Sequence, residues 1–169
     1  MEYNVSTLKT NTIQAATGTT VNVASGQVLV QPGMVLQVVN AQYATETSTS
    51  SGTYSDTGLT ATITPKFATS KVLVQINQNG IYKTADAAAN LINVKVFRDS
   101  TELDFVANGA AYTATAVRNN IGTCSYVKLD NPATTSAVTY KTQFNSNGVN
   151  GYVQTNNLPS DITLMEIAQ

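Results

Sequence analysis

The feature that most restricts the fold of this chain is the alternation of apolar and polar residues along short segments. Val72, Val74 and Ile76 occupy every second position of residues 71–79, and residues 138–145 repeat the pattern. Successive side chains of a strand point to opposite faces, so a period of two predicts strands with one buried face. Such strands are typical of antiparallel sheets with one solvated side.

Turn-forming dipeptides punctuate these segments, as expected for many short strands in succession. The expected strands are residues 34–43, 59–64, 71–79, 91–98, 102–107, 121–129, 138–145 and 162–168. The expected turns are Asn79-Gly80, Asn108-Gly109, Asn131-Pro132, Asn147-Gly148 and Asn150-Gly151. The pattern predicts an all-β fold, an antiparallel, jelly-roll-like β-sandwich.

Two segments lack a clear strand pattern. Residues 84–90 are rich in alanine but span only about two helical turns, so we expect a loop with room for one helical turn. Residues 45–58 are a low-complexity stretch of small polar residues, which predicts a mobile loop or a hairpin tip that carries Tyr54.

The N-terminal region differs from the rest of the chain. Its apolar pieces are each too short to form a sheet with its own core. Gln31-Pro32-Gly33 is the natural boundary, because proline and glycine stop strand pairing. We therefore expect an N-terminal docking or assembly arm, residues 1–31, and a β-sandwich head, residues 32–169.

Apolar residues that the arm cannot cover by itself are expected to contact other chains, since a large exposed apolar patch usually marks an interface. The last strand is expected to contribute to the same contacts. The predicted assembly residues are Leu8, Ile13, Val21, Val23, Val28, Val30, Ile162, Leu164 and Ile167.

Low charge excludes several classes of function. Charged residues make up 11% of the chain and the formal net charge is −1, against about 25% charged residues in an average soluble domain. Nucleic-acid binding is not expected, because neutralising phosphates supplies most of that affinity.

No apolar stretch of about 18 residues is present, so membrane insertion is not expected. No secretory signal is expected at the N-terminus.

The residues for common catalytic chemistry are missing. The sequence has no histidine, which removes the usual general base and the serine and cysteine arrangements that depend on it. Cys124 is the only cysteine; it can form neither an intrachain disulfide nor a multi-cysteine zinc site, and it is expected to be a small buried residue. We predict no enzyme activity, cofactor or metal.

The tightest acidic cluster is Asp99, Glu102 and Asp104. The favoured interpretation is a tight hairpin with its tip at Asp99-Ser100-Thr101 and its acids facing water. Calcium binding and a glycoside-hydrolysing carboxylate pair are the alternatives, although the glycine of a calcium loop is missing.

Three tyrosines near turns are candidates for contact with a glycan: Tyr54, Tyr112 and Tyr152. The alternative is that each packs half-buried at a strand end with its hydroxyl in water. The absence of tryptophan weakens the glycan hypothesis.

Several segments, in the same order along the chain, resemble fibre-like structural proteins of tailed bacteriophages, marine ones especially. They resemble the start of those proteins, the entry to the globular domain, the block that follows it, and the last strand. The segments are residues 6–14 (STLKTNTIQ) with Thr17-Gly18 and Val21-Asn22-Val23, residues 32–39 (PGMVLQVV), 54–59 (YSDTGL), 63–65 (ITP), 70–74 (SKVLV) and 162–168 (ITLMEIA). The resemblance extends over most of the chain and is least in residues 85–120.

The resemblance implies a homotrimer with a jelly-roll head, similar in shape to tumour-necrosis-factor and C1q heads, and an arm that docks on other virion proteins. It implies a decoration protein, head fibre or tail fibre on the virion surface, on capsid or tail, made in the host cytoplasm. An adhesin that recognises a host surface glycan is the alternative. A depolymerase is a third hypothesis, for which the required carboxylate pair is poorly supported.

Overall fold

A computed structural model describes residues 17–19, 23, 25, 29–84 and 88–169 of the chain. The chain divides into two units, Met1–Val30 and Gln31–Gln169. Every described strand belongs to the second unit, which we call the head.

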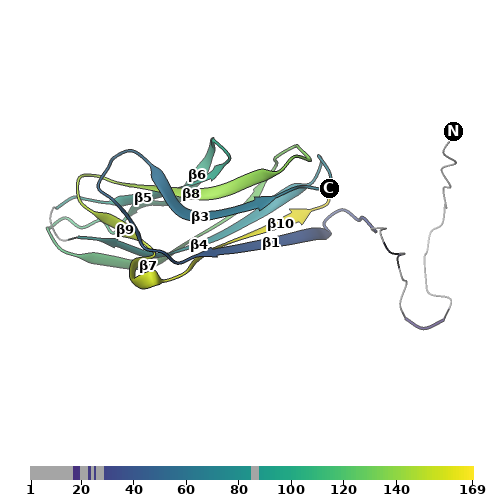
Figure 1. Cartoon of the computed structure of the whole chain (residues 1–169), viewed down its shortest axis with the longest axis horizontal. Coiled ribbons are helices and arrows are strands. Elements are labelled where there is room, and N and C mark those ends of the chain that lie inside the picture. The colour runs from purple at the N-terminus through teal and green to yellow at the C-terminus, as the bar shows by residue number, and fades with distance from the viewer. Residues whose placement is uncertain (1–16, 20–22, 24, 26–28, 85–87) are drawn as a thin grey trace. The chain divides into compact units, whose positions relative to one another are not determined.

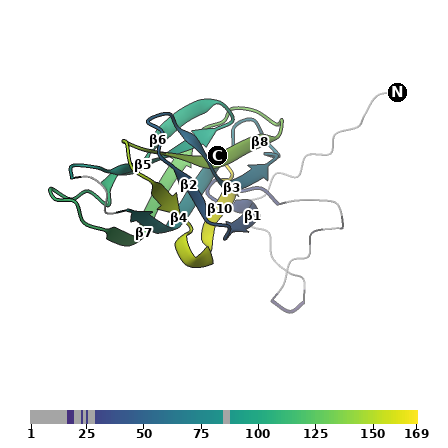
Figure 2. The ribbon, with the colours of Figure 1, turned by 60° about the vertical axis from the view of Figure 1, so that its left-hand side comes forward.

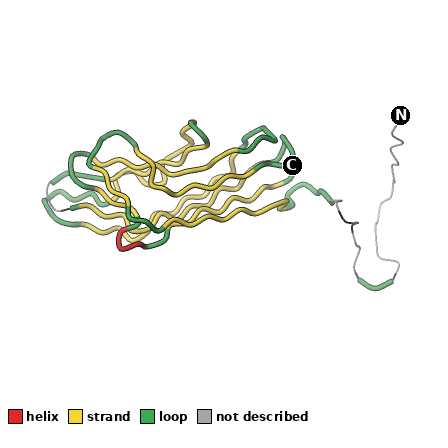
Figure 3. The backbone as a smooth tube through the Cα atoms, viewed as in Figure 1, coloured by secondary structure: helices red, strands yellow, loops and turns green. Residues whose placement is uncertain are grey.

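The head is a sandwich of two antiparallel sheets (Figure 1). The six-stranded sheet contains β1 (Val35–Tyr43), β10 (Ser160–Ile167), β4 (Lys71–Lys83), β7 (Asn119–Asp130), β9 (Gly151–Val153) and β2 (Thr47–Thr49). The four-stranded sheet contains β3 (Ser55–Ile63), β8 (Val138–Ser146), β5 (Ile92–Arg98) and β6 (Thr101–Ala110). The one helical turn in the described residues is the 3₁₀ turn η1 (Thr155–Asn157), coloured red in Figure 3.

The strand pairing follows one long hairpin that is rolled into two layers. Its tip is Asp99-Ser100, between β5 and β6. From that tip outward β5 pairs with β6, β4 with β7, β3 with β8, β2 with β9 and β1 with β10. Successive pairs of long strands alternate between the two sheets, which lie face to face in the turned view (Figure 2). This is a jelly-roll strand order, and it confirms the predicted fold class. The hairpin predicted with its tip at Asp99-Ser100-Thr101 is present, with Thr101 already the first residue of β6.

All eight expected strands are present, with some shifts at their ends. Two expected turns are wrong, because Asn79-Gly80 lies inside β4 and Asn108-Gly109 lies inside β6. Gly80 has a φ of 63°, and the buried positions of β4 change from even-numbered to odd-numbered residues there. The dipeptide therefore marks an irregularity within a continuous strand rather than a reversal of the chain.

The two segments without a clear strand pattern also differ from expectation. Residues 45–58 are only partly a loop, since they contain β2 and the first residues of β3; Tyr54 lies on the connection between these two strands. In residues 84–90, the described positions hold a turn and no helix, and residues 85–87 lie outside the described part.

Two apolar clusters fill the space between the sheets, and buried polar side chains lie between the same layers. The larger cluster includes Leu59, Ile76, Tyr140 and Leu164, each at most 1% exposed. The second cluster is centred on Phe144 and its neighbours at the other end of the sandwich, with Ile81, Ile92 and Val153 around it.

A chain of hydrogen bonds connects the two sheets through the interior. The Thr57 and Thr142 hydroxyls of the four-stranded sheet are 2.6 Å apart, and the Thr142 hydroxyl donates to Gln78 Oε1 of the six-stranded sheet at 2.9 Å. Because the Thr142 proton goes to Gln78, the Thr57 hydroxyl must be the donor to Thr142. Gln78 Nε2 then donates to Ser160 Oγ at 3.0 Å.

Replacing Thr142 with valine is expected to lower the free energy of unfolding by about 2 kcal/mol, because Gln78 Oε1 loses its donor in a dry environment. Thr139→Val on the same strand is the control, since its hydroxyl bonds to Thr62 at an exposed position; its effect is expected to stay within about 0.5 kcal/mol. Urea unfolding of both variants measures the difference. Equal stability of the two variants would contradict a stabilising role for the buried chain of hydrogen bonds.

Candidate functional site

The candidate site is an apolar row on the outer face of the six-stranded sheet. Val38 of β1 lies opposite Met165 of β10, Met165 lies opposite Leu73 of β4, and Leu73 lies opposite Leu129 of β7. Val38 is 56% exposed and Leu129 is 48% exposed. Since the neighbouring Leu164 is fully buried and strand side chains alternate in direction, this row points outward and crosses four strands.

Further apolar side chains flank this row. Val35, 47% exposed, lies opposite Ile167, and Val127, 62% exposed, lies two positions from Leu129 on β7. We call this surface the assembly face; it consists of Val35, Val38, Leu73, Val127, Leu129, Met165 and Ile167. Contiguous exposed apolar patches are unusual on a monomer and mark interfaces.

The rest of the same outer face is polar but has little charge. Asn40 Nδ2 donates to Thr163 Oγ1 at 2.8 Å, and Ser125 Oγ donates to Asn77 Oδ1 at 2.8 Å. Amide and hydroxyl groups both donate and accept hydrogen bonds, so such rows can bond to an identical surface. The charged residues on this part of the outer face are Lys71, which lies opposite Ile167, and Asp161, which lies opposite Asn77.

The ion pairs of the head gather on the other layer of the sandwich. Each of the four described ion pairs has at least one residue in the four-stranded sheet: Lys95–Glu102, Arg98–Asp130, Lys128–Asp104 and Lys141–Asp56. Removing charges from water is costly, and the centres of interfaces are depleted of charged residues. The six-stranded sheet is therefore the layer that can be covered at the lower desolvation cost.

Arg98 illustrates the structural role of these charges. Its Nη1 lies 2.5 Å from Asp130 Oδ2, which also accepts a hydrogen bond of 2.7 Å from the Tyr140 hydroxyl. Burial is the main reason that the pKa of Tyr140 is raised, and the hydrogen bond to Asp130 adds to it. Tyr140 is fully buried, so this group joins the layers and is not available for chemistry.

The structure corrects part of the predicted assembly surface. Ile162 and Leu164 face the sandwich interior and are fully buried in the larger apolar cluster of their own chain. The prediction that they bury against neighbouring chains is wrong, because alternate residues of β10 face inward. Ile167 lies in an outward-facing, partly exposed position.

The arm residues are only partly described. Val23 is 46% exposed and Val30 is 42% exposed. Leu8, Ile13, Val21 and Val28 lie outside the described residues.

Sequence reasoning missed most of the assembly face. Its signal is an interruption of the alternation, where an apolar residue occupies the outward position beside a buried one. Val72-Leu73-Val74 and Leu164-Met165 are such runs, and the register brings Leu73 and Met165 together.

The three tyrosines predicted to contact a glycan lie in different surroundings. The Tyr54 ring centroid is 4.6 Å from Lys95 Nζ, whereas Tyr152 of β9 packs on Tyr82 with ring centroids 5.4 Å apart. Tyr112, between β6 and β7, is 52% exposed. No described contact joins any two of the three.

The three clustered acids bind to different groups. Asp99 Oδ1 accepts a hydrogen bond of 2.9 Å from the Thr139 backbone, while Glu102 lies 2.8 Å from Lys95 and Asp104 lies 3.8 Å from Lys128. Among the described residues, no group of three acidic, histidine or cysteine side chains could hold a metal ion. This arrangement does not bring the acids together as a calcium site.

Cys124 of β7 is half-buried against the second apolar cluster, and this burial raises its pKa. No helix within the part of the chain that the structure describes is long and apolar enough to cross a membrane.

The described head is thus an all-β sandwich with jelly-roll strand order and one outer face that is partly apolar and carries little charge. No protein-family model matches the sequence, and no curated protein matches it.

Solved structures that resemble the fold come from infectious bursal disease virus. A chain of the Gx strain structure has 13% identity and a TM-score of 0.45, and the match covers 88% of this chain and 36% of that chain. The VP2 subviral particle gives 13% identity and a TM-score of 0.43, with 88% of this chain and 37% of that chain covered. This chain spans little more than a third of either, and likeness at this level does not define its function.

Proposed function

We propose that this chain is a non-enzymatic virion structural protein of a tailed phage, a homotrimeric decoration or fibre protein mounted on capsid or tail. The observation that carries the proposal is the outward apolar row Val38–Met165–Leu73–Leu129. A second copy of the chain is a suitable cover for this row, since the surrounding amides and hydroxyls are self-complementary and the face has almost no charge to repel an identical one.

The phage setting, the trimer and the shape shared with tumour-necrosis-factor and C1q heads rest on the sequence resemblance. Only 11% of the residues are charged. This agrees with a protein that functions as part of an assembly, because large buried contacts tolerate few unpaired charges. The arm is proposed to attach the head to other virion proteins, and the virion surface is the proposed location.

Deleting residues 1–31 is expected to leave a folded head that no longer attaches to particles, because the head contains both apolar clusters and all the described strands. Co-sedimentation with purified particles that lack the protein measures attachment, and circular dichroism with thermal unfolding checks the fold. The full-length chain is the control. A truncated head that still decorates particles would refute the docking role of the arm.

The adhesin alternative is supported by the aromatic and polar surface around Tyr54. Binding of the isolated head to host cells or to a glycan array favours an adhesin, and loss of host polysaccharide on incubation favours a depolymerase. Restored particle stability after adding the protein back, with neither of those results, favours decoration.

A further inference from the structure

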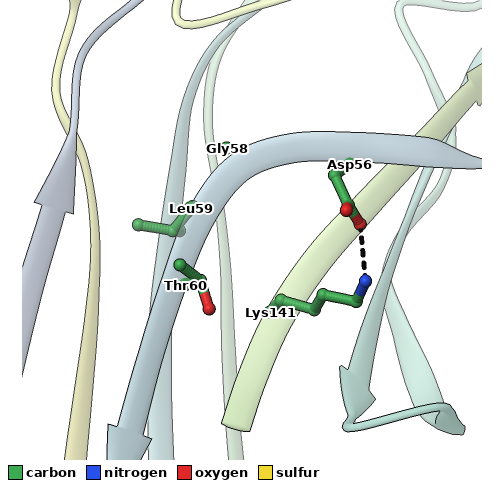
Figure 4. A pocket seen from close by; sticks show the side chains of 5 residues that line it. All are labelled: Asp56, Gly58, Leu59, Thr60 and Lys141. Carbon is green, nitrogen blue, oxygen red and sulfur yellow. Dashed lines mark ion pairs between the residues drawn. The ribbon is translucent and has the colours of Figure 1, made fainter.

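A bulge in β3 opens a pocket on the outer face of the four-stranded sheet. Asp56 lies opposite Gln143 and Thr60 lies opposite Lys141, so the three residues 57–59 of β3 oppose a single residue of β8. The strand bends away from β8 between these two positions (Figure 4). The resulting pocket has a volume of 130 Å³ and is lined by Asp56, Gly58, Leu59, Thr60 and Lys141.

The bulge is held in place by contacts of its own residues. Gly58 has a φ of 90°, and a Cβ at this position would overlap the ring of Tyr43. Thr57 is fully buried and hydrogen-bonds to Thr142 at 2.6 Å. Bulges fixed in this way re-aim side chains next to binding sites, and the pocket is therefore formed before any ligand arrives.

The polar groups of the pocket are oriented but not saturated. Asp56 Oδ1 accepts hydrogen bonds from Lys141 Nζ at 2.9 Å and from Gln143 Nε2 at 2.7 Å. Partial burial alone would raise the pKa of Asp56, but these hydrogen bonds outweigh it and hold the pKa below its ordinary value. Asp56 Oδ2 accepts no hydrogen bond from the described residues, and the side chain is 57% exposed, so an acceptor on the pocket wall can still take a hydrogen bond from a ligand.

An aromatic shelf adjoins the pocket. Gln143 lies opposite Lys95 on β5, and Lys95 lies opposite Phe105 on β6. Lys95 Nζ is 4.6 Å from the ring centroid of Tyr54 and 4.7 Å from that of Phe105. The ammonium of Lys95 therefore covers part of both rings. Phe105 is still 38% exposed, so the shelf leaves some ring surface open beside the Gln143 amide and the Asp56 carboxylate.

The charges around the pocket cancel in pairs. Lys141 is paired with Asp56, and Lys95 is paired with Glu102 at 2.8 Å. A phosphate or sulfate would have to displace one of these carboxylates, and a cation would meet a lysine beside each of them. A neutral ligand with several hydroxyl groups avoids both costs, because it uses the free lone pairs for hydrogen bonds and the rings for apolar contact.

We propose that the β3 pocket and the Tyr54–Phe105 shelf bind a pyranose ring of a neutral glycan. A sugar hydroxyl donates to Asp56 Oδ2, a second bonds to the Thr60 hydroxyl, and the apolar face of the ring lies on the shelf. The site is on the opposite sheet from the assembly face, so it goes beyond the assembly role and does not depend on it.

The test uses the full-length protein, labelled with ¹⁵N, and the methyl α-glycosides of glucose, galactose, mannose and N-acetylglucosamine as separate probes. At least one probe is expected to shift the backbone amide signals of Gly58 and Thr60 in a saturable way. Asp56→Asn is expected to raise the dissociation constant about tenfold or more, since a hydrogen bond to a charged acceptor is lost.

Asp104→Asn is the matched control, because the two aspartates are similarly exposed, 57% for Asp56 and 55% for Asp104, and both face a lysine. The control is expected to bind like the unmodified protein, and thermal unfolding of both variants checks that they fold. Four results would each overturn the proposal: no response to any probe, shifts confined to signals outside the pocket, equal weakening by both substitutions, or tighter binding of the methyl glycoside of N-acetylneuraminic acid, which is anionic.

Discussion

A protein in which Val38 and Leu129 are both replaced by lysine is expected to stay folded and to lose its self-association. Both side chains point to solvent in the isolated head, with exposed fractions of 56% and 48%, so the substitutions leave the interior unchanged. In an assembly they would place unpaired charges inside a contact, at a cost of several kcal/mol. The dissociation constant for self-association should rise at least about 100-fold, as measured by sedimentation velocity over a range of concentrations.

Thr62→Lys is the control for this experiment. Thr62 is an exposed, β-branched residue in a strand of the four-stranded sheet. The substitution therefore introduces a lysine side chain on the opposite layer. It should leave the sedimentation profile unchanged. If the control dissociates and the Val38/Leu129 variant does not, the contact lies on the four-stranded sheet and the proposed assembly face is wrong.

Gly80→Ala is expected to lower the free energy of unfolding by about 3–5 kcal/mol, from a left-handed backbone conformation and from steric overlap together. Gly80 has a φ of 63° in the middle of β4, and an added Cβ would overlap the backbone nitrogen of Thr155 in η1. Backbone cannot move aside as a flexible side chain can, so the 3₁₀ turn would have to shift. Thermal and urea unfolding of the purified variant measure the loss.

Gly109→Ala separates the two contributions. Gly109 is also preceded by asparagine and also lies in a strand with a positive φ, 83°, but a Cβ there meets open space. This variant should lose only about 1 kcal/mol, the cost of the left-handed conformation for alanine. If the two variants are equally stable, the close approach of η1 to β4 does not contribute to stability.

The sequence predicted the regular part of the fold well. Strands such as β8 and β10 alternate cleanly because one face is buried and the other is solvated, and the hairpin tip at Asp99-Ser100 has residues that favour a turn. The three-residue strands β2 and β9 carry too few residues for any period to be visible. They form because the rolled hairpin places them side by side.

The misassigned dipeptides have a physical explanation. Asn-Gly favours a positive φ whether or not the chain reverses, and both a turn and an irregular strand position use that conformation. At Gly80 the neighbouring segment is η1 of the same chain, which lies far from Gly80 in sequence. Only the tertiary contact therefore distinguishes an irregular strand from a turn.

The candidate sites were harder to predict than the fold. Ile162 and Leu164 are apolar for reasons of packing, and nothing in their own segment separates an inward face from a contact between chains. The assembly face and the β3 pocket both depend on register, which aligns Leu73 with Met165 and sets three residues of β3 against one of β8. Register between distant strands is fixed by the whole sandwich and is not readable from local patterns.

The most direct test of the proposed role is a cryo-EM reconstruction of purified virions at a resolution that separates strands. We expect three copies of the head around a common axis, each with the six-stranded sheet against a neighbouring copy and residues 1–31 against another virion protein. The four-stranded sheet, with its ion pairs and β3 pocket, should face solvent. A particle without this chain, or one in which Val38 and Leu129 face solvent in every copy, would contradict the proposed assembly.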